Sequence, residues 1–128
     1  MAELDLDAPL DGGLSAGAQA AIDALPATSA LLVVLRGPNA GSRFLLDADS
    51  TTAGRSTKSD IFLDDVTVSR RHADFVRVGA EFWVRDLGSL NGTYVNRERV
   101  EEVQLRASDE VQIGKYRLTF HPSPIREA

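Results

Sequence analysis

Residues 73–86 read ADFVRVGAEFWVRD, two runs rich in β-branched and aromatic side chains that are separated by Gly79-Ala80. In the second run the apolar triplet Phe82-Trp83-Val84 lies between charged ends. Short runs of this composition, bounded by turn residues, are typical of antiparallel strands, and glycine supplies the positive φ that many turns need. We therefore predict strands over residues 73–78 and 81–86, joined by a tight turn.

Similar runs continue on both sides of this hairpin, at a spacing of about 8 to 12 residues that is typical of all-β sandwiches. Turn residues separate them, and Asn91-Gly92 is the strongest short turn signal. No helical periodicity follows Thr28. The sequence thus predicts an all-β sandwich of ten or eleven short, mostly antiparallel strands. The further strands are expected at residues 30–36, 43–47, 51–53, 61–63, 93–95, 110–113 and 116–121.

Residues 1–28 differ from this pattern because they are rich in Ala, Gly, Asp and Leu and contain almost no β-branched or aromatic residues. They include five acids and no Lys or Arg, and so they account for the whole net charge of −5. We expect a flexible acidic tail over residues 1–28, a folded domain over 29–122 and a C-terminal tail over 123–128. A short helix between Ser15 and Leu25, capped by Ser15 and stopped by Pro26, is the alternative for part of the tail.

Composition narrows the classes of function. The chain has 128 residues, 43% of them hydrophobic, which suits one domain with its own core. Without cysteine it offers no disulfide, thiolate zinc site or cysteine nucleophile, which suits a reducing cytoplasm. No apolar run reaches the roughly 18 residues of a membrane span, and the N-terminus lacks the basic start of a signal peptide. An acidic chain suits nucleic acid poorly. We expect a cytoplasmic protein, monomeric, that binds neither membrane nor nucleic acid.

Polar and basic residues concentrate in three loops between predicted strands, at residues 54–60, 68–72 and 88–93. Loops on a rigid sandwich commonly carry binding residues. These loops offer guanidinium groups, hydroxyls and a side-chain amide, the donors that match the oxygens of a phosphate dianion. Asn91 can donate and accept at once and is therefore a candidate for holding a peptide backbone.

Gly54-Arg55, then Ser69-Arg70-Arg71-His72, then Gly88-Ser89-Leu90-Asn91-Gly92-Thr93 resemble, in this order, the signature of forkhead-associated (FHA) domains. Such domains bind phosphothreonine peptides through loops at one end of an eleven-stranded sandwich. The resemblance implies that Arg55 and Ser69 hold the phosphate and that Ser89 or its loop assists. Asn91 then fixes the peptide backbone, and Arg70 lines the same rim. Gly54, His72 and Gly92 match positions that support the site.

The runs 31–46, 59–72 and 88–97 further resemble the GarA/OdhI-type regulators of actinobacteria. That resemblance implies docking on the 2-oxoglutarate dehydrogenase complex, glutamate dehydrogenase and glutamate synthase, under the control of Ser/Thr protein kinases that phosphorylate a threonine in the tail. The Glu-Thr-Thr-Ser motif of that tail is not found in residues 1–28, where Ser15 and Thr28 are the hydroxyl-bearing residues. A purely phosphate-independent inhibitor therefore stays open as the alternative.

Other kinds of site are less well supported. Ser69 and His72 lack the Gly-x-Ser-x-Gly elbow and the oriented acid of a hydrolase, so no catalytic residue is nominated. No glycine-rich run has the spacing of a nucleotide phosphate loop, and no cofactor is expected. Asp64 and Asp65 without further ligands indicate a solvated turn and not a metal site. We expect His72 to pack inside the protein and His121 to be exposed.

Overall fold

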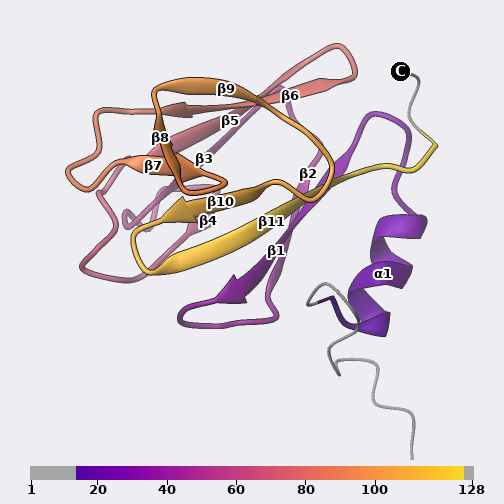
Figure 1. Cartoon of the computed structure of the whole chain (residues 1–128), viewed down its shortest axis with the longest axis horizontal. Coiled ribbons are helices and arrows are strands. Elements are labelled where there is room, and N and C mark those ends of the chain that lie inside the picture. The colour runs from indigo at the N-terminus through magenta and orange to yellow at the C-terminus, as the bar shows by residue number, and fades with distance from the viewer. Residues whose placement is uncertain (1–13, 126–128) are drawn as a thin grey trace, which may run out of the picture.

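The computed structural model of this protein describes residues 14–125 and contains, within that range, one helix and eleven strands (Figure 1). Within residues 14–125, no helix is long and apolar enough to cross a membrane. The elements are α1 (Ala16–Asp23), β1 (Ala30–Arg36), β2 (Arg43–Leu46), β3 (Ser50–Gly54), β4 (Ile61–Phe62), β5 (Ala73–Val78), β6 (Glu81–Asp86), β7 (Thr93–Val95), β8 (Glu98–Val100), β9 (Glu102–Leu105), β10 (Glu110–Ile113) and β11 (Tyr116–Pro122).

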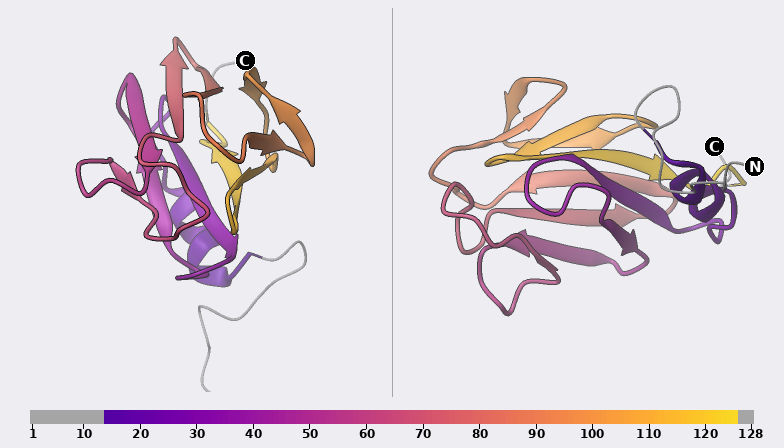
Figure 2. Two further views of the ribbon diagram at one scale, coloured as in Figure 1. Left: turned by 90° about the vertical axis from the view of Figure 1, so that its left-hand side faces the viewer. Right: turned by 90° about the horizontal axis from the view of Figure 1, so that it is seen from below.

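The strands form two sheets that face each other (Figure 2). One sheet has six strands in the order β2-β1-β11-β10-β7-β8, and the other has five in the order β4-β3-β5-β6-β9. Strands β3 and β4 run parallel, and the remaining neighbours run antiparallel. The predicted all-β sandwich, including the 73–86 hairpin as β5 and β6, is confirmed.

The core lies between the inner faces of the two sheets, because side chains alternate along each strand. On β1 the inward positions are Ala30, Leu32 and Val34, all buried. The rings of Phe82 on β6 and Phe120 on β11 pack across the sandwich with their centroids 5.5 Å apart. Each such side chain contributes roughly 1.5–3 kcal/mol through its burial, so the core stabilises the sandwich without disulfides.

The outward face of β1 is also apolar, and helix α1 covers it. Ala18, Ile22 and Leu25 are buried against Leu31 and Val33 of β1. Ser15 caps the helix, since its Oγ accepts a hydrogen bond from the Ala18 amide at 3.0 Å. The expectation of a flexible tail is therefore wrong for residues 14–28, because an apolar run on both faces of β1 needs cover on both. Residues 1–13 lie outside the described range.

The same helix explains why the expected exposure of His121 is wrong. His121 pairs with Leu31 across β11 and β1, on the face that α1 covers. Its side chain is 8% exposed, and its Nε2 lies 2.8 Å from Thr119 Oγ1. Burial lowers the pKa of His121 because the charged imidazolium is poorly solvated there.

Candidate functional site

Three loops meet at the end of the sandwich opposite α1 (Figure 1). They connect β3 with β4 (residues 55–60), β4 with β5 (63–72) and β6 with β7 (87–92). Ser69 joins all three, since its carbonyl accepts from the Arg55 amide at 3.0 Å and its Oγ accepts from the Leu90 amide at 3.0 Å. The structure thus brings together the segments that the sequence singled out.

Gly54 allows the first two loops to approach closely. A Cβ at this position would lie 2.0 Å from the carbonyl oxygen of Arg70, which no side chain can tolerate without backbone movement. The same carbonyl accepts a hydrogen bond from the Ser56 amide at 3.2 Å. A glycine is therefore required here for packing, and it sets the position of both Arg55 and Arg70.

The Arg55 side chain is anchored at its base and open at its tip. Its Nε donates to the Val68 carbonyl at 3.1 Å, while its Nη groups have no hydrogen bond to another described residue. Arg70 is exposed, and its guanidinium likewise has no hydrogen-bond partner within residues 14–125. Two guanidinium groups on adjoining loops thus have N–H donors available for an anion.

His72 links the second and third loops from beneath. It is fully buried, its Nδ1 accepts from the Ser69 amide at 3.1 Å, and its Nε2 lies 2.9 Å from the Gly92 carbonyl. Because Nδ1 accepts, the proton belongs on Nε2, which donates to Gly92. Burial lowers the pKa of His72, against the smaller opposing effects of the Gly92 carbonyl and Asp86. A neutral imidazole thus holds Ser69, whose hydroxyl proton stays available.

Asp86 organises the third loop. One carboxylate oxygen accepts from Ser89 Oγ and Thr93 Oγ1 at 2.5 and 2.7 Å, and the other accepts from the amides of Gly88 and Ser89 at 3.0 and 3.1 Å. Burial acts to raise the pKa of Asp86, but these hydrogen bonds together lower it. Ser89 is buried and its Oγ also accepts from the Gly92 amide at 3.0 Å. The Ser89 hydroxyl therefore shapes the loop from inside.

Asn91 lies exposed at the tip of that loop. Its Nδ2 donates to the Thr67 carbonyl at 2.9 Å, which leaves its amide oxygen and second N–H open. Gly92, at φ +87°, follows in a conformation that side chains rarely adopt. A hollow of about 270 Å³ opens beside Asn91. Its other lining residues are Thr67, Gly92, Tyr94, Gln112, Gly114 and Lys115.

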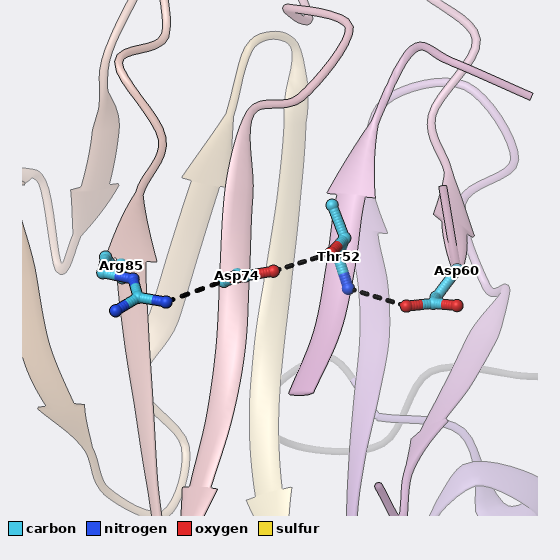
Figure 3. A network of polar contacts seen from close by, with 4 residues as sticks. All are labelled: Thr52, Asp60, Asp74 and Arg85. Carbon is cyan, nitrogen blue, oxygen red and sulfur yellow. Dashed lines mark hydrogen bonds and ion pairs between the residues drawn. The ribbon is translucent and has the colours of Figure 1, made fainter. Parts of the chain in front are cut away.

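A line of polar contacts braces the sheet beneath the loops (Figure 3). The Thr52 amide donates to Asp60 at 3.0 Å, and its hydroxyl donates to Asp74 at 2.7 Å. Arg85 completes the line with an ion pair to Asp74 at 3.4 Å. Strands β3, β5 and β6 are thus tied together where they enter the loops, and Asp60 fixes the end of the β3–β4 loop.

Asp65, one of the two acids considered for a metal, serves the β4–β5 turn. Its carboxylate accepts from the hydroxyl and the amide of Thr67, and these two bonds lower its pKa. No cluster of three or more potential metal ligands occurs among residues 14–125. Sequence reasoning missed the roles of Asp86 and Thr67. The role of Asp86 could have been inferred, because an Asp side chain commonly accepts hydrogen bonds from backbone amides two or three residues further along the chain.

Comparison with known proteins places this geometry in context. The family profile of the FHA domain matches residues 51–114. The glycogen accumulation regulator GarA of Mycolicibacterium smegmatis is 63% identical over 120 residues, covering 94% of this chain and 75% of that protein. The oxoglutarate dehydrogenase inhibitor of Corynebacterium efficiens is 62% identical, covering 94% of this chain and 84% of that protein. A structure solved for phosphothreonine-dependent FHA domain interactions aligns with a TM-score of 0.71 at 32% identity, over 77% of this chain and 100% of its own.

Proposed function

The chain belongs to the FHA domain family, and from that premise we propose that it is a phosphothreonine-binding adaptor, not an enzyme, that regulates metabolic enzymes by docking on them. The observation that carries the proposal is the set of free donors at one end of the sandwich. Arg55, Arg70 and the Ser69 hydroxyl have hydrogen-bonding capacity that residues 14–125 leave unused. These donors match the three acceptor oxygens of a phosphate.

Each site residue has a separate task in this proposal. Arg55 and Ser69 bind the phosphate, and Arg70 adds positive charge at the rim. Asn91 binds the peptide backbone with its open amide oxygen and second N–H. Ser89, whose hydroxyl is engaged by Asp86, assists by holding its loop. Gly54, His72 and Gly92 keep the loops in position and make no contact with the peptide. The FHA domain spans residues 29–122, with α1 as an accessory element.

The metabolic part of the proposal follows from the relatives. Proteins more than 60% identical to this chain are named as an oxoglutarate dehydrogenase inhibitor and a regulator of glycogen accumulation. We infer that this chain docks on the 2-oxoglutarate dehydrogenase complex, and we extend the inference to glutamate dehydrogenase and glutamate synthase. Ser/Thr protein kinases enter as the source of the phosphothreonine and as partners through their own phosphorylated segments. The cytoplasm, where these enzymes work, is the proposed location.

The decisive experiment is calorimetric titration with one threonine peptide from a kinase activation loop, phosphorylated and unphosphorylated. Removing a charge-assisted hydrogen bond costs about 1.5–3 kcal/mol, so Arg55→Ala should weaken binding of the phosphopeptide roughly 10- to 150-fold. Arg106→Ala is the matched control, because Arg106 is exposed and follows β9, away from the three loops. If the protein bound both peptides with the same affinity, and Arg55→Ala did not change that affinity, the phosphate-independent inhibitor would be the better description.

A further inference from the structure

Two large aliphatic side chains stand in solvent among the polar residues of the site. Val66 in the β4–β5 loop is 88% exposed, and Leu90 in the β6–β7 loop is 86% exposed. They are the most exposed of the large hydrophobic residues in the described part of the chain, where the next in rank, Ile125 and Val78, are 67% and 58% exposed. Single exposed apolar residues are ordinary on protein surfaces, but a pair at a binding site is not.

The loops hold both side chains outward. Val66 lies within a turn that is closed by the bond from the Val68 amide to the Asp65 carbonyl and is capped by the Asp65 side chain. The Leu90 amide is bound by Ser69 Oγ at 3.0 Å. These bonds fix the backbone of both loops, and in that backbone conformation both side chains lie in solvent. A turn does not itself require valine or leucine, since polar residues and glycine are favoured there.

The two residues also lie on either side of one bridge. The Asn91 side chain donates to the Thr67 carbonyl at 2.9 Å and thereby joins the neighbours of Leu90 and Val66. The donors for phosphate on Arg55, Ser69 and Arg70 come from the same or adjoining loops. A peptide bound by its phosphate and held by Asn91 therefore passes close to both aliphatic side chains, which it can cover.

We propose that Val66 and Leu90 form the apolar half of the site and select phosphothreonine segments that carry aliphatic or aromatic side chains beside the phosphothreonine. The inference rests on the proposed function, because Val66 and Leu90 lie in two of the three loops that form the proposed phosphothreonine site. The phosphate half supplies charge-assisted hydrogen bonds, which any phosphothreonine peptide can satisfy. The apolar half supplies burial, which only some sequences can satisfy, and so it discriminates between partners.

The test uses the full chain and two synthetic phosphothreonine peptides, one with alanine on both sides of the phosphothreonine and one with leucine there. Calorimetry should show that the wild-type protein binds the leucine peptide about 10-fold more tightly, which is about 1.4 kcal/mol. The double variant Val66→Ser/Leu90→Ser should reduce this preference to less than about 2-fold while leaving affinity for the alanine peptide nearly unchanged. The control Leu45→Ser/Val78→Ser removes exposed aliphatic side chains from β2 and β5 and should keep the preference.

The outcomes separate the inference from its premise. If the alanine peptide bound through Arg55 but leucine added nothing, or if the double variant kept the preference, the apolar half would be refuted while the phosphothreonine site stood. If neither phosphopeptide bound the wild-type protein, both the site and the inference would fall. Thermal unfolding of each variant checks the fold, and exposed substitutions of this kind should change stability by less than about 0.5 kcal/mol.

Discussion

Asp86 lies outside the motif but accepts more hydrogen bonds than any other side chain of the third loop, and substituting it tests how that loop is held. Its two carboxylate oxygens accept four hydrogen bonds, from Gly88, Ser89 twice and Thr93. Asp86→Ala removes all four acceptors. Asp86→Asn is the informative partner, because a rotated amide can keep all four contacts: its oxygen accepts from the two backbone amides, and its NH₂ donates to the two hydroxyls.

The expected magnitude follows from burial. Gly88 is an exposed residue, so we expect its amide to bond water at little cost, whereas Ser89 is 8% exposed and Thr93 is fully buried. Two buried hydroxyls left unsatisfied cost about 1–3 kcal/mol each, so Asp86→Ala should lower the free energy of unfolding by about 3 kcal/mol. Asp86→Asn keeps a partner for each of these groups but loses the charge and the acceptor for the two hydroxyl protons. It should therefore cost about 1–2 kcal/mol, less than Asp86→Ala.

The assay is urea unfolding followed by the fluorescence of Trp83, the only tryptophan of the chain. Glu81→Ala removes an exposed carboxylate from the start of the same strand and should change stability by less than about 0.5 kcal/mol. If Asp86→Ala cost no more than Asp86→Asn, the loop would not depend on this carboxylate. A changed m-value would show that the variant also altered the denatured or native ensemble.

Three further perturbations test other parts of the structure. Burial lowers the pKa of His72 and His121, so the unfolded chain binds more protons below pH about 6.5; stability should be fully present above that pH and fall with acidification by up to about 1.4 kcal/mol per pH unit and histidine. Urea titrations at several pH values should show that the free energy of unfolding falls less steeply with acidification in His72→Gln and in His121→Gln than in the wild-type protein. A fall as steep as that of the wild-type protein would contradict this. Ile22→Ala should cost about 2 kcal/mol in the same assay, and no cost would mean that α1 is not docked. Gly54→Ala places a methyl group 2.0 Å from the Arg70 carbonyl and should abolish phosphopeptide binding in calorimetry, whereas unchanged affinity would refute the close approach.

Much of the fold could be predicted from the sequence because the inner strands are short apolar runs bounded by turn residues. The runs at 30–36, 73–78, 81–86, 93–95 and 110–113 appear as strands with those limits. Strands β8 and β9 escaped prediction because both lie at sheet edges, where charged residues are favoured, and only Glu101 separates them. The chain passes from one sheet to the other at that residue without any glycine or proline.

Helix α1 was harder to predict because its stability comes from what it covers. An eight-residue helix is marginal in water by itself. The signal was present in β1, where Leu31 and Val33 are as apolar as the inward residues between them, so that a sheet with one solvated face could not explain both sets. A continuous apolar run at the start of an antiparallel sheet therefore predicts a cover, and the nearest segment able to supply one was residues 16–25.

In the site, the exposed polar residues could be predicted from the sequence, whereas the contacts that position them could not. The residues that we propose face a ligand, Arg55, Ser69 and Asn91, could be singled out from their side-chain chemistry together with the order of the three loop motifs, which resembles that of FHA domains. The residues that position them act through contacts between loops distant in sequence, as when His72 reaches Gly92 or Asn91 reaches Thr67. Such contacts fix the loops before any peptide arrives, so less ordering is needed on binding and more of each hydrogen bond appears as affinity. A variant that loosens a supporting contact should therefore weaken phosphopeptide binding without removing any group that touches the peptide.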